Sequence, residues 1–319
     1  MKHQKSFLLP LLLQLLIAVI ITSCKKDDAG PQKFAIEGIT KENFPQVDGS
    51  TSTQPLQTLI ACKLLDINYV WVGWETSFIT PAPAEDEESR SFIHDHVRNT
   101  GTHDAIINLI NGDADIILVA RKASTPELKA AMAKNVKLIE TPVAIDAFIF
   151  ILNKTNPVTS LTTSQIRGIY TGAITRWDQV GGSQERINPY RRNPTSGSQV
   201  LMEELVMKDT PMMEMPEMHE FRSMFGPFEQ LERDKNGICY TVYYYKEFMV
   251  KPWSVKHIAV NGVYPDYNSL RKREYPYTTE VYLSIREDLD KSSTAYKLYE
   301  LILSRAGREV IKESGYVPF

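Results

Sequence analysis

The sequence YRRNPTSGSQ at residues 190–199 stands directly ahead of an apolar run at residues 200–207 and marks a predicted helix start. It places a guanidinium beside several hydroxyl groups and a glycine. The first N–H groups of a helix have no intrahelical partner and carry partial positive charge, so they attract anions. Gly197 lets the backbone come close to a ligand, and Arg192 offers a planar set of donors to a tetrahedral oxyanion. Taken alone, the stretch favours a simple N-cap in this turn.

Two further stretches share this character. The sequence DGSTSTQPL at residues 48–56 precedes apolar residues at helical spacing, and Pro55 suits a first helical turn. The sequence TGTH at residues 100–103 opens a third helical pattern, with apolar residues at positions 106, 107, 109 and 110. Three such helix starts, with one or two arginines, are suited to bind a single anion if the fold brings them together.

These segments resemble those of phosphate-binding proteins of the periplasmic type, the substrate-binding components of phosphate ABC transporters. Residues 48–56 are similar to the hydroxyl-rich first loop of that family, and TPVAIDAFIFILN at residues 141–153 is similar to its middle segment. The block 141–207 carries the most specific match, and the resemblance covers nearly the whole chain after its N-terminal segment. It implies an α/β, two-lobed fold of type II with a hinge and a ligand cleft between the lobes.

The resemblance implies that the chain binds inorganic phosphate in the cleft and delivers it to an ABC permease, as a monomer without a cofactor. One alternative is a binder of another oxyanion, such as sulfate or molybdate. A second is a non-transport lipoprotein that senses or scavenges phosphate at the cell surface. An enzyme is not expected, because the sequence has no phosphate-binding loop for ATP, no G-x-S-x-G turn and no H-E-x-x-H motif.

The resemblance also assigns phosphate-binding residues from three parts of the chain. Adjacent residues of a strand point to opposite faces, so Arg191 is expected to face solvent or an ion-pair partner while Arg192 faces the ligand. The expected phosphate ligands are Ser50, Thr51, Ser52, Thr53, Gly101, Thr102, Arg121, Arg192, Ser196, Gly197 and Ser198.

Arg121 is a departure from the family pattern. Many phosphate binders carry an aspartate after the equivalent strand, and that aspartate accepts a hydrogen bond from a protonated phosphate. Arg121 is expected to act as a second donor, so strict rejection of sulfate is not expected. Asp48 or Asp146 are the candidates to supply an acceptor, although a role as a cap or as a hydrogen-bond partner at the hinge is favoured for both.

The N-terminus reads as an export signal. Lys2 and Lys5 precede an apolar stretch that is short for a membrane span and ends in Ile-Thr-Ser-Cys, which resembles a bacterial lipobox. Residues 1–23 are therefore predicted to be a lipoprotein signal peptide, and Cys24 the lipidated residue of a tether over 24–33. An ordinary signal peptide is the alternative. The protein is expected in the cell envelope, facing the periplasm or the cell surface.

The remaining length favours two lobes rather than one core. The predicted first lobe comprises residues 34–142 and 275–319, the second residues 143–274, with crossovers near 140–145 and 272–280. Helices are predicted over 51–65, 102–111, 126–133, 162–170, 197–207 and within 293–314, and strands over 69–72, 114–120, 137–143, 147–152, 187–191, 237–243 and 280–285.

Composition limits other functions. The chain has a formal net charge of −3, which argues against a nucleic-acid-binding surface. Cys62 is expected to be a buried thiol in a helix, and no disulfide framework is indicated. No metal is expected at the histidines of 94–103, which adjoin an acidic loop at 85–88. The methionines of 212–218 are expected to fill gaps under loops rather than to bind copper.

Overall fold

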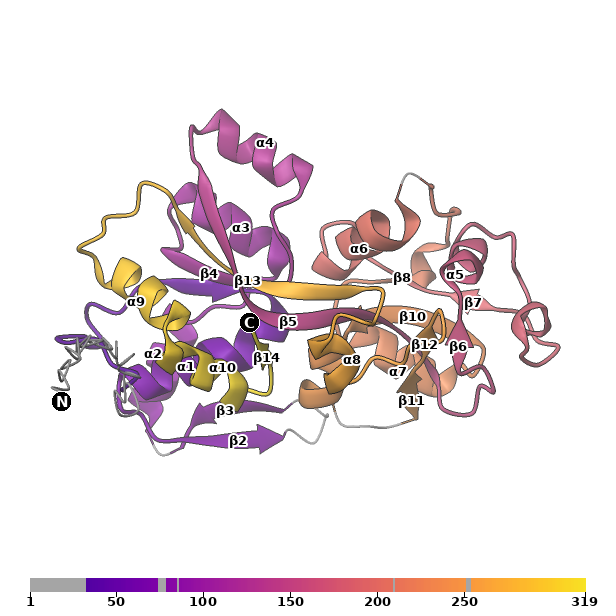
Figure 1. The fold of residues 1–319 in the computed structure, drawn as a ribbon, viewed down its shortest axis with the longest axis horizontal. Helices are drawn as coiled ribbons and strands as arrows, with labels where there is room; N and C mark the ends of the chain where they lie inside the picture. The colour runs from indigo at the N-terminus through magenta and orange to yellow at the C-terminus, as the bar shows by residue number, and fades with distance from the viewer. Residues whose placement is uncertain (1–32, 74–78, 85, 209, 251–253) are drawn as a thin grey trace, which may run out of the picture. The chain divides into compact units, whose positions relative to one another are not determined.

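The longest strand, β5 (Leu138–Asn153), connects two groups of strands (Figure 1). The computed structural model describes residues 33–319 except 74–78, 85, 209 and 251–253. The first half of β5 pairs with β13 (Thr278–Arg286) and its second half with β10 (Gly237–Val242). Residues 143–153 are all buried, which fits a strand covered on both faces.

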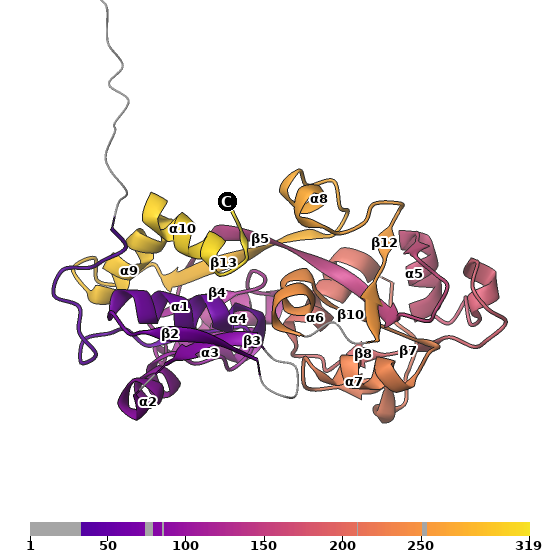
Figure 2. The same ribbon diagram turned by 90° about the horizontal axis from the view of Figure 1, so that it is seen from below.

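The main sheet has the order β1-β4-β13-β5-β10-β7. The strands β1 (Val47–Gly49) and β4 (Ile116–Val119) are parallel, whereas β13 runs antiparallel to β4 and β5. The other members are β7 (Asn188–Pro189), β11 (Val255–His257) and β14 (Val317–Pro318), the last two paired with β5. Figures 1 and 2 show β5 passing from the neighbourhood of β4 and β13 to that of β10 and β12.

The prediction of two separate strands at 137–143 and 147–152 is wrong, because β5 is one strand. Pro142 cannot donate a hydrogen bond to the ladder, and the register with β13 shifts between Val281 and Tyr282, so Val143 is left without an opposite residue. Such a bulge bends a strand without ending it. Asp146, in the middle of the predicted gap, keeps the chain extended and accepts hydrogen bonds from the N–H groups of Ala147 and Tyr244.

Five predicted helical regions are confirmed. They are η1 (Thr51–Thr53) with α1 (Gln54–Leu64), α3 (Thr102–Asn111), α4 (Thr125–Ala133), α5 (Thr163–Tyr170), and α9 (Thr294–Leu303) with α10 (Arg305–Glu313). Cys62 lies in α1 as a buried free thiol, as predicted.

Three predicted elements differ from the structure. The helix over 197–207 consists of α6 (Gly197–Leu201) followed by a π-helix, η3 (Met202–Met207). The strand over 187–191 is split into β7 and β8 (Arg191–Arg192), which pairs with β9 (Glu220–Phe221). The acidic loop instead begins α2 (Glu87–His96), because the carboxylate of Asp86 accepts the N–H of Ser89 and acidic residues stabilise a helix start.

The remaining elements flank the main sheet. The predicted strand over 69–72 is confirmed as β2 (Tyr69–Gly73), which forms a hairpin with β3 (Ile79–Pro83). Others are β6 (Ser160–Leu161), β12 (Ala259–Val260), α7 (Gly226–Arg233), α8 (Tyr267–Arg271), η2 (Trp177–Val180), η4 (Glu217–His219) and η5 (Tyr245–Met249). Within the described residues, we find no helix that is both long and apolar enough to span a membrane.

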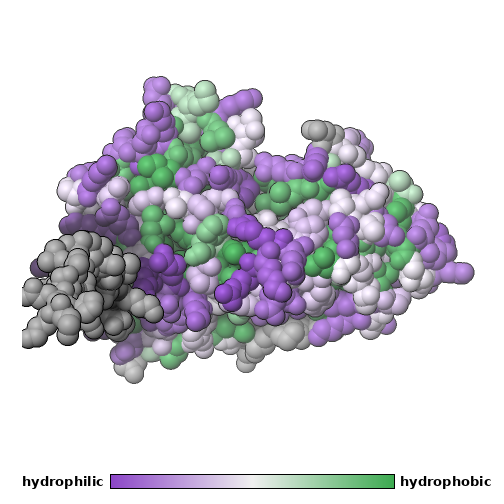
Figure 3. Space-filling model, viewed as in Figure 1, coloured by the Kyte–Doolittle hydropathy of each residue, from purple (hydrophilic) through white to green (hydrophobic). Residues whose placement is uncertain are grey.

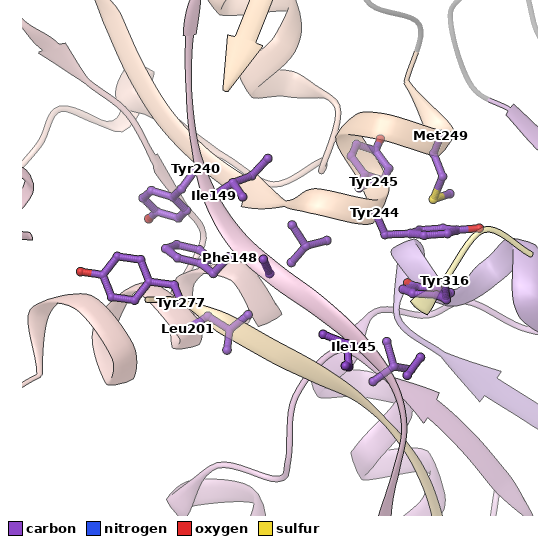
Figure 4. Close-up of a cluster of buried hydrophobic side chains, with 14 of the residues drawn as sticks. Ile145, Phe148, Ile149, Leu201, Tyr240, Tyr244, Tyr245, Met249, Tyr277 and Tyr316 are labelled. Carbon is purple, nitrogen blue, oxygen red and sulfur yellow. The ribbon is translucent and has the colours of Figure 1, made fainter. Parts of the chain in front are cut away.

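Aromatic side chains pack on both sides of β5 where it changes partners (Figure 4). Phe148 lies against Tyr240, with ring centroids 5.3 Å apart. Tyr244 stacks on Tyr316 near the C-terminus, with centroids 3.6 Å apart. Tyr240, Tyr244 and Tyr316 are all buried, so these rings serve packing.

Helix α4 has little of its surface covered. Its buried residues are Glu127 and Ala131, whereas Leu128 and Met132 are exposed by 44% and 74%. Figure 3 shows hydrophobic colour at the top of the molecule, over α4. The attachment of α4 therefore depends strongly on the side chain of Glu127.

Candidate functional site

A cavity of about 460 Å³ lies where η1, α3 and α6 begin. Its lining comes from segments far apart in the sequence: the loop after β1, the loop before α3, the segment from β8 to α6, and the loop before α7. The lining residues are Ser50, Thr51, Ser52, Thr100, Gly101, Thr102, His103, Asp104, Ala120, Arg192, Asn193, Thr195, Ser196, Gly197, Ser198, Leu201, Arg222, Ser223, Met224, Phe225, Val242 and Tyr245.

Nine of the eleven residues expected to bind phosphate line this cavity: Ser50, Thr51, Ser52, Gly101, Thr102, Arg192, Ser196, Gly197 and Ser198. The other two, Thr53 and Arg121, do not line it. The hydroxyl of Thr53 points into the protein, where it lies 2.6 Å from the carbonyl oxygen of Leu118. It supports the loop from behind.

The first loop is fixed by Ser50. Its hydroxyl accepts the N–H of Ala120 at 3.0 Å and lies 2.8 Å from the hydroxyl of Thr102. This pair joins the start of η1 to the start of α3. No side-chain hydrogen bond caps η1, and its residues Thr51 and Ser52 line the cavity. The N–H groups at this helix start are therefore available to an anion.

The start of α3 is held in place by a buried carboxylate. Asp48 accepts hydrogen bonds from the N–H of Thr100 at 3.0 Å and from its hydroxyl at 2.9 Å, and a further one from Asn108. Gly101 then takes a φ of +101°, which favours glycine, and no side chain caps the helix. The N-terminus of α3 is thus left open to an anion. Asp48 has a structural role, as favoured from the sequence, and does not line the cavity.

Arg192 supplies positive charge from the opposite side. Its side chain is 5% exposed, and its guanidinium donates to the carbonyl oxygens of Phe221 at 3.0 Å and Arg222 at 2.8 Å. Burial lowers the pKa of this guanidinium. Among the ion pairs of the described residues, none involves Arg192. A buried cation without a carboxylate beside a cavity is suited to bind an anion.

The neighbouring arginine behaves as its strand position predicts. Arg191 points away from the cavity and forms an ion pair of 2.9 Å with Glu220. Its side chain is 30% exposed. The alternation expected for adjacent strand residues is confirmed.

Gly197 lies against the start of α3. A β-carbon at this position would lie 2.4 Å from the hydroxyl oxygen of Thr102, closer than atoms can approach without a shift. Ser196 caps the helix by accepting the N–H of Gln199 at 3.1 Å. The start of α6 and the start of α3 therefore meet at Gly197, where a side chain would collide with Thr102.

Arg121 is engaged away from the cavity. Its guanidinium binds the carboxylate of Glu127 with both terminal nitrogens, at 2.7 and 2.9 Å, and donates to the carbonyl oxygen of Lys122. Both side chains are buried, at 4% and 1% exposed. The expectation that Arg121 is a second donor to the ligand therefore has no support from its placement.

Asp146 lies in β5 among the aromatic residues of the core, outside the cavity lining. One carboxylate oxygen accepts two backbone N–H groups, and the other has no hydrogen-bond partner. Burial raises the pKa of Asp146 to about 7. Its contacts fit the favoured structural role.

The raised pKa of Asp146 predicts a pH-dependent stability. The pKa of an unfolded aspartate is about 3.9, whereas the folded Asp146 stays protonated until about pH 7. The unfolded state therefore loses its proton first, and this group lowers the free energy of unfolding as pH rises from about 4 to about 7. Asp146→Asn should flatten that slope in urea titrations across this range. Identical slopes for both proteins would show that Asp146 ionises normally in the fold.

The described residues contain no group of three or more histidines, cysteines or acids that could hold a metal ion. His94 lies 3.0 Å from Asp95, and its side chain is 88% exposed. In the methionine segment, Met213 and Met215 pack against the core, whereas Met218 is 77% exposed.

Some lining residues were not foreseen from the sequence. Residues 222–225 reach the cavity because β9 pairs with β8. Strands of two residues are too short to show an alternating pattern in the sequence, so this pairing was not predicted. Thr100, His103 and Asp104 flank residues that were expected at the site. Their position next to Gly101 and Thr102, at a predicted helix start, was the available signal.

Comparison with known proteins places this chain in a family. Residues 84–311 match the model of the PBP superfamily domain, and the chain belongs to that superfamily. Protein SphX of Synechococcus elongatus is 27% identical over 258 residues, covering 77% of this chain and 76% of that protein. Phosphate-binding protein PstS of Pseudomonas aeruginosa strain PAO1 is 24% identical over 251 residues, covering 71% and 74%.

Two solved structures show the same fold. A candidate phosphate ABC transporter substrate-binding protein from Clostridium perfringens, solved with bound phosphate, superposes with a TM-score of 0.64 at 21% identity, covering 86% of this chain and 98% of its own. An ABC-type phosphate transport receptor from Vibrio cholerae gives 0.60 at 22% identity, covering 88% and 99%. The expected α/β, two-lobed fold is confirmed.

Proposed function

We propose that the chain binds inorganic phosphate in this cavity and delivers it to an ABC permease. The observation that carries the proposal is Arg192, a buried guanidinium without a carboxylate partner among the described residues, at the wall of a cavity lined by hydroxyls. Relatives of this chain that are named phosphate-binding proteins, such as PstS of Pseudomonas aeruginosa, support phosphate as the anion. The solute-binding family also supports a role without catalysis.

The proposed phosphate shell has two sides. Ser50, Thr51 and Ser52 with the start of α3 form one side. Arg192 with Ser196–Ser198 forms the other. Backbone N–H groups and hydroxyls replace the water around phosphate, and Arg192 balances its charge. Thr53 is proposed to support the first loop from behind.

We assign the two sides to two lobes, residues 34–142 with 275–319 and residues 143–274. The main connections are β5 and the segment before β13, so bending there would open and close the cavity. The bulge at Val281 and the change of strand partners at Ala147–Phe148 support this position for the hinge. The chain would act as a monomer.

Calorimetry with phosphate, sulfate and molybdate tests the assignment. The proposal expects phosphate to bind most tightly. Stronger binding of sulfate or molybdate would establish the alternative oxyanion function. A protein that binds phosphate, but whose deletion leaves phosphate uptake by cells unchanged, would instead be a sensor or a scavenger.

Gly197→Val should weaken phosphate binding at least tenfold. The added side chain would meet Thr102 and hold the two sides of the shell apart. The free energy of unfolding should change little, because Gly197 lies at the cavity rather than in the core. Gly181→Val is the control outside the cavity: valine is strained at its φ of +84°, so this variant should lose stability while keeping its phosphate affinity. Equal affinity in the wild type and in Gly197→Val would show that the two sides need not touch.

Cys24 is proposed to carry a lipid that anchors the protein in the cell envelope. It lies outside the described residues, and the proposal rests on the Ile-Thr-Ser-Cys sequence at residues 21–24. Cys24→Ala should abolish incorporation of labelled fatty acid and release the protein from membranes, whereas Cys62→Ala should leave labelling unchanged. Continued labelling of Cys24→Ala would remove the lipoprotein assignment. Protease treatment of intact cells distinguishes display at the surface from a periplasmic location.

A further inference from the structure

A buried carboxylate links the cavity to the core of the first lobe. Glu127, in the first turn of α4, is 1% exposed and has four hydrogen-bond donors around it. Arg121 supplies two of them, and the N–H of Ser124 supplies one at 2.7 Å. The fourth is Nδ1 of His103, which lies 2.9 Å from Oε1 of Glu127.

The charge of Glu127 settles which nitrogen of His103 carries the hydrogen. Burial alone would raise the pKa of Glu127, but the hydrogen bonds and charge of Arg121 outweigh it and lower the pKa to about 2. Glu127 is therefore ionised at neutral pH, and an ionised carboxylate only accepts hydrogen bonds. Nδ1 of His103 must donate. In the neutral imidazole, Nε2 is then left as an acceptor.

His103 is also placed to reach a ligand. It is the second residue of α3, follows Gly101 and Thr102, and lines the cavity. Its side chain is 34% exposed, and the hydrogen bonds of the described residues include none to Nε2. The acceptor is thus not used by the protein itself.

We propose that His103, oriented by Glu127, accepts a hydrogen bond from the proton of the bound anion and so selects protonated phosphate over fully ionised oxyanions. This inference rests on the proposed phosphate-binding function. Donors such as Arg192 and the helix N–H groups suit phosphate and sulfate alike. An acceptor distinguishes the two anions. Sulfate has no proton to donate, so one of its oxygen lone pairs would face the lone pair of Nε2 and repel it.

Asp104 is the competing acceptor, because it is the next residue and also lines the cavity. It is exposed, however, so water can satisfy its carboxylate. His103 is instead held by a partner that is buried. The structure therefore favours His103, and a variant of Asp104 serves as the matched comparison.

Competition titrations at neutral pH test the proposal. The ratio of the sulfate to the phosphate dissociation constant should fall at least tenfold in His103→Leu, which removes the acceptor and leaves Arg121 and Ser124 on Glu127. Asp104→Asn should change that ratio less than threefold. A ratio that is unchanged in His103→Leu, or that falls only in Asp104→Asn, would overturn the proposal.

A second measurement does not depend on a variant. Nitrogen-15 chemical shifts of the wild type should show His103 with its hydrogen on Nδ1 in the neutral form, and the Nε2 resonance should move when phosphate binds. A neutral form with the hydrogen on Nε2, or an Nε2 resonance that phosphate leaves unmoved, would contradict the proposal. If the wild type binds neither phosphate nor sulfate, the proposed function fails first. If it binds phosphate and His103→Leu discriminates as well as the wild type, only the role of His103 fails.

Discussion

Arg192→Ala should weaken phosphate binding by well over tenfold. Truncating one member of a desolvated, hydrogen-bonded charge pair typically costs about 2–5 kcal/mol, much of it from the partner that is left unpaired. Arg192 is buried, and its guanidinium is held by two carbonyl oxygens at the cavity wall. The loss should appear in calorimetric titrations of phosphate.

Arg191→Ala is the matched control for this experiment. Arg191 has the same side chain and neighbours Arg192 in β8, but it pairs with Glu220 away from the cavity. An exposed or half-exposed ion pair contributes about 0–1 kcal/mol, so phosphate affinity should stay within about threefold of the wild type. Equal losses in the two variants would mean that Arg192 acts on the fold and not on the ligand.

Glu127→Ala should have the largest effect on stability. Breaking a buried ion pair by removing one partner costs about 3–5 kcal/mol, because the other charge stays buried without compensation. In Glu127→Ala, the guanidinium of Arg121 would stay buried without its carboxylate partner, and α4 would lose one of its two buried side chains. Urea denaturation should show a free energy of unfolding lower by this amount.

Glu287→Ala provides the comparison for the ion pair alone. Glu287 pairs with Lys137 at 3.2 Å, with side chains 58% and 77% exposed. Its removal should change the free energy of unfolding by less than about 1 kcal/mol. A similarly small change in Glu127→Ala would show that water reaches Arg121 and that the pair is not sealed in the core.

The sequence allowed the helix starts of the site to be predicted well, because they carry local signals. Hydroxyls, Gly101 and Pro55 stand directly before apolar residues at helical spacing, and α1 and α3 begin where these signals lie. Their convergence on one cavity did not follow from these signals. It depends on the parallel pairing of β1 with β4 and on the contact between Gly197 and Thr102, which are long-range features.

The position of Arg121 shows where prediction from the sequence fell short. The family resemblance suggested a ligand-facing donor at this position, but the side chain turns to Glu127, six residues later in the chain. The choice between a ligand and an internal partner depends on how α4 packs on α3. Similarly, the sequence predicted separate strands over 137–143 and 147–152, whereas the bulge opposite β13 accommodates Pro142 within one strand, β5.

The most direct test of the proposed function is a calorimetric titration of the purified, phosphate-free protein with inorganic phosphate. We expect one saturable site per chain, with phosphate bound more tightly than sulfate or molybdate and with the binding lost in Arg192→Ala. Absence of a saturable phosphate signal in the wild type, or full binding by Arg192→Ala, would contradict the assignment of this cavity as a phosphate site.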